Sequence, residues 1–304
     1  MRYGFVRDHS RRWGVGRLCR LLSMSVSGYY AWRDRRPSRR ARQDACLLAE
    51  IGAIFAASRQ TYGYRRIHAQ LAATQACGRD RVARLMRGAR LQPKRKRRFK
   101  VTTQSQHRCP IAPNRLGQAF TATAVNQKWL ADITYIPTGE GWLYLATVED
   151  LFSRGIVGWS MEPTLTDHLT CQALQMALNR RRPPEGLIHH SDRGSQYASD
   201  NYTALLRKAQ AVQSMSRTGN PYDNAPQESF FSRLKNELIC DRPFANRRQA
   251  RVGIFEYIEV FYNRQRLHSA LGYRSPLQFE ALHATPLLTV HFFQGITVGR
   301  TLNS

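Results

Sequence analysis

The chain contains 304 residues, of which 42% are hydrophobic and 22% charged, as in an ordinary globular protein. Its formal net charge of +26 favours a polyanionic partner, most often nucleic acid, although a membrane-surface or purely solvating role would also fit the charge. The six cysteines form no CxxC pair, so neither a disulfide framework nor a zinc knuckle is indicated. No apolar signal core and no run of eighteen apolar residues occurs, so we expect a soluble protein inside the cell, with no membrane partner.

The basic residues are concentrated in the first part of the chain. Residues 1–121 carry 28 basic and 5 acidic side chains, whereas residues 122–304 carry 19 and 16. We therefore expect the first part to bind the polyanion, and the second part to have the charge balance of a conventional enzyme core.

The first part opens with an Arg-rich helical segment over residues 1–43, which contains the aromatic cluster Gly28–Trp32. Apolar residues at helical spacing then predict three short helices, over residues 44–58, 64–74 and 79–91. Three such helices with many arginines are typical of a helix-turn-helix DNA-binding module, predicted here over 44–91, with Arg65 and Arg66 exposed. A generic three-helix bundle with a solvated charged face would give the same pattern.

Residues 92–121 are predicted to be a basic linker, because they are polar and lack apolar periodicity. The linker opens with a cluster of basic residues that we expect to contact DNA phosphates: Lys94, Arg95, Lys96, Arg97 and Arg98. A nuclear localisation signal would look the same.

The second part has an α/β pattern. Strands are predicted at 128–136, 142–149, 156–161, 187–190 and 211–215, and helices at 167–181, 200–209, from 223 onward, and at 246–264. Strands come first, and helix and strand then alternate, which predicts a mixed sheet with flanking helices over residues 122–285. Residues 286–304 are assigned to a C-terminal tail.

Three acidic residues stand where catalytic metal ions would need ligands. Asp132 lies inside an apolar strand, where an unpaired carboxylate is costly and must be paired or bind metal. Asp192 directly follows the strand 187–190, and Glu228 falls in the first turns of the helix that Asp223 is expected to cap. Phosphoryl transfer on DNA commonly uses two Mg²⁺ ions, about 3.5–4 Å apart, held by carboxylates.

The sequence around these acids resembles that of a known family. WLADITYI surrounds Asp132, HSDRGSQY surrounds Asp192, and MSRTGNPYDNAPQESFFSRLKNEL surrounds Glu228, with 35 residues between the last two acids. Further matching runs are SVSGYYAW, TYGYRRI and FYNRQRLHSALGYRSP, so the similarity covers roughly residues 15–283. The chain thus resembles the second-frame (OrfB) transposases of the third bacterial insertion-sequence family, in the retroviral-integrase-like superfamily that uses two Asp and one Glu.

The resemblance implies a ribonuclease-H-like integrase core over residues 122–285, with Asp132, Asp192 and Glu228 as catalytic and metal-binding residues. It implies two Mg²⁺ ions, with Mn²⁺ able to substitute. The implied activity is nicking of DNA at insertion-sequence ends, followed by strand transfer through a circular DNA intermediate.

The resemblance also implies partners and a location. The partners are the terminal repeats, target DNA, further copies of the chain on DNA, and an upstream-frame protein joined to it as a frameshift fusion. That upstream frame supplies another helix-turn-helix and a leucine zipper, so we expect this chain not to recognise the DNA ends fully by itself. The implied location is the bacterial cytoplasm, at the nucleoid.

Several neighbours of the acids carry weaker signals. Lys235 lies on the same helix face as the third acid and is predicted to hold DNA, although a solvated lysine fits equally well. One of His189 and His190 is expected to orient the site by hydrogen bonding rather than to bind zinc. Glu149 and Asp150 do not match the catalytic positions, and Asp150 is expected to cap or pair locally.

Two rival functions share much of this pattern. A non-catalytic DNA-binding regulator derived from a transposase would need the charge but not the acids, and the intact acidic triad argues against it. A structure-specific nuclease of the same fold would cut without joining, and only the family resemblance separates it from a transposase.

Overall fold

A computed structural model describes residues 2–94, 110–217, 221–239 and 243–284. The chain divides into two compact units, Met1–Gln92 and Pro93–Ser304. Within the described residues, no helix combines the length and the apolar character that a membrane crossing needs.

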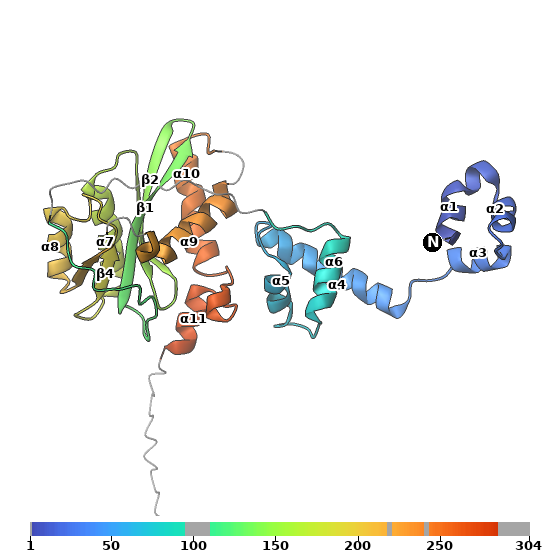
Figure 1. The fold of residues 1–304 in the computed structure, drawn as a ribbon, viewed down its shortest axis with the longest axis horizontal. Helices are drawn as coiled ribbons and strands as arrows, with labels where there is room; N and C mark the ends of the chain where they lie inside the picture. The colour runs from blue at the N-terminus through green and yellow to red at the C-terminus, as the bar shows by residue number, and fades with distance from the viewer. Residues whose placement is uncertain (1, 95–109, 218–220, 240–242, 285–304) are drawn as a thin grey trace, which may run out of the picture. The chain divides into compact units, whose positions relative to one another are not determined.

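Three short helices open the first unit (Figure 1): α1 (Arg2–Trp13), α2 (Val15–Leu21) and α3 (Val26–Arg33). They enclose a small apolar core of buried and partly buried side chains: Val6, Leu18, Cys19, Tyr29, Tyr3, Val15, Leu22, Met24 and Trp32. The aromatic residues noted in the sequence therefore hold these three helices together.

The next three helices are α4 (Arg39–Ala57), α5 (Tyr64–Leu71) and α6 (Arg79–Gly88). They match the three predicted helices, but α4 begins five residues earlier because Ser38 caps it by accepting a hydrogen bond from the Ala41 N–H. Asp44 on α4 accepts hydrogen bonds of 2.7 Å from both Arg81 and Arg84 on α6. The all-helical region that was predicted to precede the catalytic core is confirmed.

The second unit is built on a mixed sheet with strand order β3-β2-β1-β4-β5. Its strands are β1 (Lys128–Thr138), β2 (Gly141–Asp150), β3 (Ile156–Glu162), β4 (Ile188–Ser191) and β5 (Val212–Met215). The first three strands are antiparallel, whereas β4 pairs parallel to β1, and β5 parallel to β4. An antiparallel meander extended by parallel strands on the β1 side is the mixed sheet that the sequence predicted, in the ribonuclease-H-like arrangement that the family resemblance implied.

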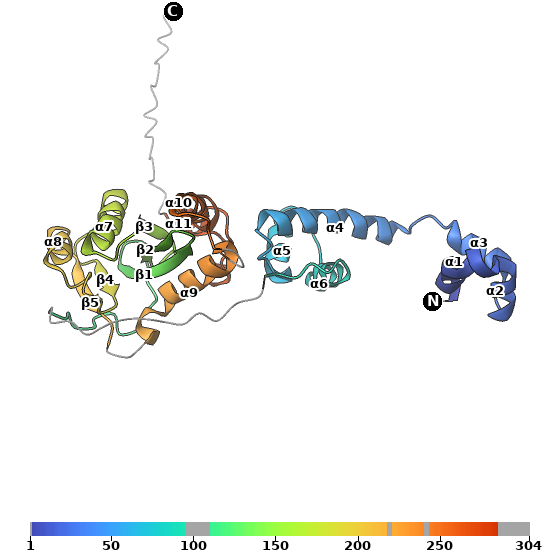
Figure 2. The same cartoon turned by 90° about the horizontal axis from the view of Figure 1, so that it is seen from above.

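Helices cover both faces of this sheet (Figure 2). One face carries α7 (Asp167–Arg181) and α8 (Asp200–Lys208), and the other carries α9 (Ala225–Leu234) and α10 (Arg247–Phe255). The main apolar core lies under α7 and α8, around Trp129, Leu174 and Tyr202. At Gly158 of β3 the helix α7 is so close that a Cβ atom would overlap the Ala173 carbonyl.

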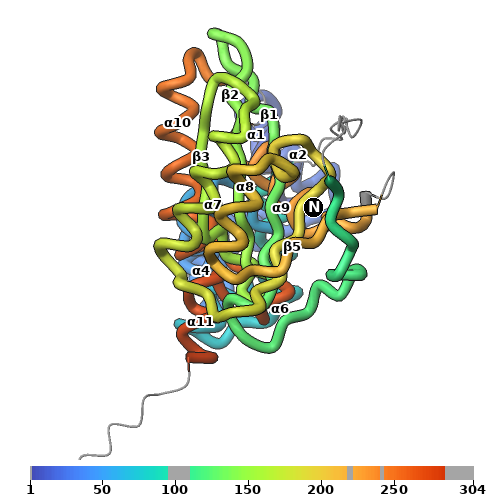
Figure 3. The backbone as a smooth tube through the Cα atoms, turned by 90° about the vertical axis from the view of Figure 1, so that its left-hand side faces the viewer, coloured from blue at the N-terminus to red at the C-terminus, as the bar shows by residue number. Residues whose placement is uncertain are grey.

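The strands differ in length, so the parallel half of the sheet ends before the β1–β2 hairpin does. β1 and β2 have 11 and 10 residues, whereas β4 and β5 have four each. The β1–β2 hairpin therefore continues beyond the parallel half of the sheet, with α10 beside it (Figure 3). There Arg247 donates hydrogen bonds to the Glu140 carboxylate and to the Trp142 carbonyl.

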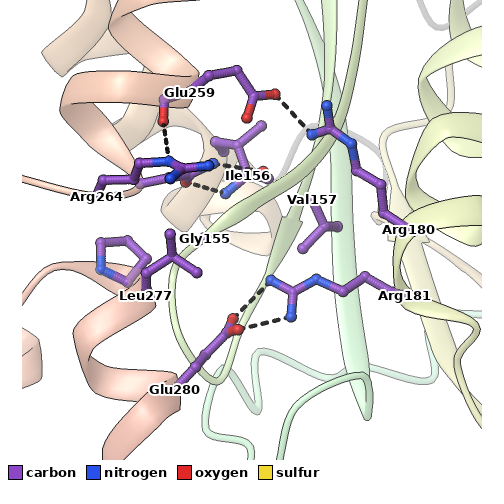
Figure 4. Close-up of a pocket in the computed structure, with 11 residues that line it drawn as sticks. Gly155, Ile156, Val157, Arg180, Arg181, Glu259, Arg264, Leu277 and Glu280 are labelled. Carbon is purple, nitrogen blue, oxygen red and sulfur yellow. Dashed lines mark hydrogen bonds and ion pairs between the residues drawn. The ribbon is translucent and has the colours of Figure 1, made fainter.

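The C-terminal helices are tied to β3 and α7 around a pocket (Figure 4). α10 continues into the π-helix η3 (Glu256–Tyr262), and α11 (Pro276–His283) follows. Arg180 donates to Glu259 at 2.7 Å, and Arg181 donates two parallel bonds to Glu280. Asn263 exchanges two hydrogen bonds with the backbone of β3. These polar contacts fix the C-terminal helices on the catalytic unit.

The segment 110–121 differs from the linker that the sequence predicted over 92–121. Leu116 is buried against Leu130 and Leu151, and Lys128 donates to two carbonyl groups of the segment. The segment has no regular secondary structure, so its packing leaves no periodic signal in the sequence. In the structure these residues are part of the catalytic unit.

Candidate active site

Asp132 and Asp192 are brought together by the parallel pairing of β1 and β4. The last paired residues of the two strands are Ala131 and Ser191, so the next residue along each strand is an aspartate. Neighbouring strands lie roughly 4.8 Å apart. The two carboxyl-bearing residues therefore lie side by side at the end of β4, where the sheet opens beside the longer hairpin.

Glu228 reaches the same region on helix α9. Its neighbour Gln227 is fully buried and hydrogen-bonds across the sheet, donating to the Leu130 carbonyl at 2.8 Å and accepting from the Thr147 hydroxyl at 3.0 Å. Leu130 and Asp132 lie on the same face of β1, because they are two residues apart. The first turn of α9 is thereby held over the strand that carries Asp132.

Electrostatic interactions couple the three acids. Burial raises the pKa of Asp132 well above its usual value, and the negative charges of Asp192 and Glu228 raise it further. The Ile133 N–H, which donates to Asp132 at 2.7 Å, and the Lys235 ammonium act in the opposite direction. Burial also raises the pKa of Glu228. The site is thus a group of carboxylates whose charges repel one another.

Family models match most of the chain. An HTH-like domain model matches residues 41–99, and two integrase core domain models match residues 122–221 and 210–276. The "Insertion element IS600 uncharacterized 31 kDa protein" of Shigella sonnei is 50% identical over 263 residues, which are 86% of this chain and 97% of that protein. The "Transposase InsF for insertion sequence IS3A" of Escherichia coli (strain K12) is 43% identical over 287 residues, 92% of this chain and 98% of that protein. The chain belongs to the IS3 family of insertion-sequence transposases.

Solved structures with a similar fold are retroviral integrases. The HTLV-2 integrase catalytic core domain in complex with magnesium covers 53% of this transposase at 16% identity and a TM-score of 0.40, and 99% of that chain is matched. The simian T-cell lymphotropic virus intasome in complex with PP2A regulatory subunit B56 gamma covers 84% at 14% identity and a TM-score of 0.45, and 80% of that chain is matched. Both are likenesses of fold at low identity.

The donor set of the transposase site suits a hard divalent cation. All three side chains offer carboxylate oxygens, the ligands that Mg²⁺ prefers, and two of them are held side by side although they repel. Within the described residues, no three acidic, histidine or cysteine side chains are close enough together to enclose an ion. The sheet holds the two aspartates next to each other, whereas Glu228 is carried separately by α9.

Lys235 lies close enough to the acids to interact with them. It begins a π-helical turn, η2 (Lys235–Ile239), directly after α9. Burial lowers the pKa of Lys235, and the charge of Asp132 opposes that effect. Such π-helical turns are frequent at functional sites. The structure thus places the Lys235 cation beside Asp132. From the sequence, a solvated surface lysine was an equally good interpretation.

The two histidines before Asp192 lie inside the fold. Burial lowers the pKa of His189 to about 3 and that of His190 to about 4, so both are neutral at physiological pH. His189 lies 3.1 Å from the Tyr202 hydroxyl, and His190 lies 2.8 Å from Ser214 Oγ and 3.1 Å from Ser216 Oγ. Their contacts are hydrogen bonds that join β4 to α8 and β5.

Asp223 is not the helix cap that the sequence predicted. The N-cap of α9 is Asn224, and Asp223 lies in the preceding 3₁₀ turn η1 (Pro221–Asn224). A hydrogen bond from Arg217 is the main cause that lowers the pKa of Asp223, which also accepts from Asn114 and Gln118. The carboxylate therefore ties the 110–121 segment to the start of the Glu228 helix. Its partners lie up to 109 residues away, and no local pattern signals them.

Glu149 and Asp150 lie at the end of β2. Asp150 accepts hydrogen bonds from the backbone N–H groups of Asn126 and Phe152, which is the local pairing that the sequence predicted. Glu149 is buried, with Arg154 at 3.8 Å.

The residues predicted to contact DNA lie in different surroundings. Arg65 is exposed as expected, but Arg66 is half-buried with its guanidinium over the Tyr62 ring, 5.6 Å from the centroid. The prediction that Arg66 is exposed was wrong because Tyr62, in the segment just before α5, offers an aromatic face to its guanidinium. Lys94 is exposed. The remaining basic residues of that cluster lie outside the described residues: Arg95, Lys96, Arg97 and Arg98.

Proposed function

We propose that this transposase nicks DNA at the ends of an insertion sequence and transfers the freed 3′-hydroxyl end to target DNA, in a reaction that depends on Mg²⁺. The observation that carries the proposal is the side-by-side placement of Asp132 and Asp192 on parallel strands, beneath the helix of Glu228. Membership of a transposase family and the match to an integrase core support the same chemistry.

The three acids have distinct roles in this proposal. Asp132 and Asp192 supply ligands from the sheet, and Glu228 completes the set from α9 to hold two metal ions, with Mn²⁺ able to replace Mg²⁺. Bound there, the metal would activate the attacking hydroxyl and offset charge on the leaving oxygen. Lys235 contributes a positive charge beside Asp132 that can hold a phosphate of the DNA near the acids.

DNA binding belongs to the basic first unit and to the basic cluster that follows it in this proposal. The HTH-like module and the basic cluster that starts at Lys94 would bind the terminal repeats through phosphate contacts. We propose further copies of the chain, and the upstream-frame protein as a fusion, as the partners that complete the recognition of both ends.

The proposal is tested by nicking and strand-transfer assays on labelled terminal repeats with and without Mg²⁺. We expect Asp132→Asn, Asp192→Asn and Glu228→Gln to abolish both steps while DNA binding is retained. Asp200→Asn, an exposed acid in the first turn of α8, is the matched control and should remain active. Full cleavage by Asp132→Asn would refute the assigned role.

A binding measurement tests the metal site without catalysis. Because burial and repulsion disfavour the charged form of Asp132, its replacement by asparagine should leave the protein at least as stable as the wild type. Mg²⁺ should raise the melting temperature of the wild type, because an ion that binds the folded protein stabilises it. It should not raise the melting temperature of Asp132→Asn, because this variant lacks one of the carboxylate ligands. Equal shifts in both proteins would contradict the site.

A further inference from the structure

Residues 2–33 form a small three-helix unit, α1–α3. The HTH-like match begins only at residue 41, so it assigns this unit no role. Its second and third helices, α2 and α3, have seven and eight residues and are joined by only four, residues 22–25. Ser23 in this turn has φ +52°, a left-handed conformation that reverses the chain sharply. Ser25 then caps α3 by accepting from the Gly28 N–H.

The packing of this unit fixes how α3 lies on the other helices. Cys19 is fully buried and occupies the inner face of α2. Gly28 on α3 lies so close to α1 that an added Cβ would be 2.6 Å from the Tyr3 hydroxyl. Tyr3 also stacks on Trp32, with 5.6 Å between the ring centroids. Two helices joined by a tight turn, with a third packed behind them, are the architecture of a helix-turn-helix.

The outer face of α3 is left uncovered within this unit. Val26 and Tyr30 are 41% and 40% exposed, and Ser27 and Ala31 are also exposed. At 3.6 residues per turn these four residues fall within roughly 140° of the helix, so they share one side of it. A serine hydroxyl, a tyrosine and small apolar groups are side chains that contact base edges and thymine methyl groups.

The charge of the unit identifies its partner. Residues 2–36 contain nine arginines and two aspartates. Both aspartates, Asp8 and Asp34, form ion pairs with the arginine that precedes them. On α2, the helix expected to cross the DNA backbone, Arg17 and Arg20 are exposed. A strongly positive surface beside an exposed helix complements duplex DNA.

We propose that residues 15–33 form a second helix-turn-helix, with α3 entering the major groove of duplex DNA and α2 contacting phosphates. Ser27 and Tyr30 contact the bases, and Arg20 contacts the backbone. The transposase thus reads DNA with two separate modules in its first unit. This assignment goes beyond the catalytic proposal and does not depend on the acidic residues.

The test is selection of binding sites from a pool of randomised duplexes by the full chain, which requires no cleavage. The wild type should enrich a motif with two separate blocks of preferred bases. Ser27→Ala and Tyr30→Ala should reduce the preference within one block by about tenfold and leave the other block unchanged. Arg20→Ala should weaken binding to all duplexes and lower the slope of log affinity against log salt by about one unit.

Phe5→Ala is the matched control, because Phe5 is an aromatic residue on α1 that is 50% exposed. It should leave both blocks intact. The proposal is overturned if Ser27→Ala and Tyr30→Ala enrich the same motif as the wild type. It is also overturned if they change only the oligomeric state, since the face would then bind protein. Val26→Ser is a further variant that keeps the test decisive if Tyr30→Ala does not fold. Loss of metal-dependent cleavage in the acidic variants would not alter any of these outcomes.

Discussion

Gln227 is a polar side chain at a core position, and its hydrogen bonds explain how the neighbouring acid is placed. On α9 it shares a buried face with Phe230 and Leu234, yet both ends of its amide are hydrogen-bonded to the sheet. Because Glu228 is the next residue, these bonds set the position of the third acid over β1. Gln227 is thus a positioning residue in the proposed mechanism.

We expect Gln227→Met to lower the free energy of unfolding by about 1–3 kcal/mol, because the Leu130 carbonyl and the Thr147 hydroxyl lose their partner inside the protein. Nicking should also slow while DNA affinity is retained. Denaturant unfolding and single-turnover nicking measure the two effects. Gln172→Met, on the exposed face of α7, is the control. If stability fell but nicking at equal folded fraction did not, Gln227 would have only a structural role.

Glu149 gives the protein a pH-dependent stability. Burial raises the pKa of Glu149 from 4.5 to about 7, which Arg154 only partly offsets. Between these values the unfolded chain has released a proton that the folded chain retains, so stability falls as the pH rises through this window. We expect Glu149→Gln to remove this fall. The difference in unfolding free energy between variant and wild type should grow from pH 4.5 to about 7 and then level off.

The control for this measurement is Glu185→Gln, which makes the same change at an exposed position. A difference between Glu149→Gln and the wild type that stays constant with pH would contradict the assignment.

For individual residues, the sequence predicted a functional role where a residue broke a local pattern. Asp132 stood out because it interrupts an apolar strand, and Asp192 because it follows one. The role of Asp223 was predicted wrongly, since its partners Arg217, Asn114 and Gln118 come together only in the folded chain. Local patterns cannot reveal bonds formed between distant segments.

At the scale of elements, all five strands and most helices were predicted within a few residues. Apolar periodicity carried several of those predictions, as in α5, α6 and the predicted helix at 246–264. The second half of that predicted helix is the π-helix η3. Over only seven residues, the side-chain pattern of a π-helix cannot be distinguished from that of an α-helix. The packed segment 110–121 was missed because irregular backbone has no period.

A buried ion pair joins the π-helical turn η2 to Arg266, which follows the second π-helical segment, η3. Glu237 of η2 accepts hydrogen bonds from the Arg266 Nε and Nη2 groups and from the Tyr257 hydroxyl. Arg266 is only 1% exposed, and Glu237 is 8% exposed. The pair therefore connects the end of the catalytic helix to the C-terminal helices.

We expect Glu237→Gln to destabilise the protein by about 3–5 kcal/mol, because it leaves the Arg266 charge buried without an anion. The double variant Glu237→Leu/Arg266→Met should be more stable than Glu237→Gln, since it buries no charge at all. Equilibrium denaturant unfolding compares the two. Arg264→Met, at an exposed neighbouring position, is the control. A double variant that loses more stability than Glu237→Gln would show that the pair itself stabilises the fold.

At the scale of the whole molecule, most of the basic charge and the three candidate catalytic acids lie in different units. The basic excess of residues 1–121 lies mostly in the first unit, whereas the three acids lie in the second. The sequence anticipated this division from composition alone, but it placed the start of the core at residue 122. The structure puts the boundary of the units at Gln92 and Pro93.

This difference in boundary can be measured with two fragments. The fragment 93–304 keeps Leu116 in its apolar site and keeps the hydrogen bonds from the Arg115 and Leu116 N–H groups to Ser214. It should therefore fold cooperatively but lose the DNA affinity and salt dependence that the first unit contributes, and keep only the part due to the basic cluster that starts at Lys94. The fragment 122–304 should be less stable by about 1.5–3 kcal/mol for the lost Leu116 contacts alone, because Leu130 and Leu151 become exposed. Thermal unfolding and DNA titrations at several salt concentrations separate these effects. Equal stability of the two fragments would mean that residues 110–121 are a linker after all, and full affinity of 93–304 would place the DNA contacts outside the first unit.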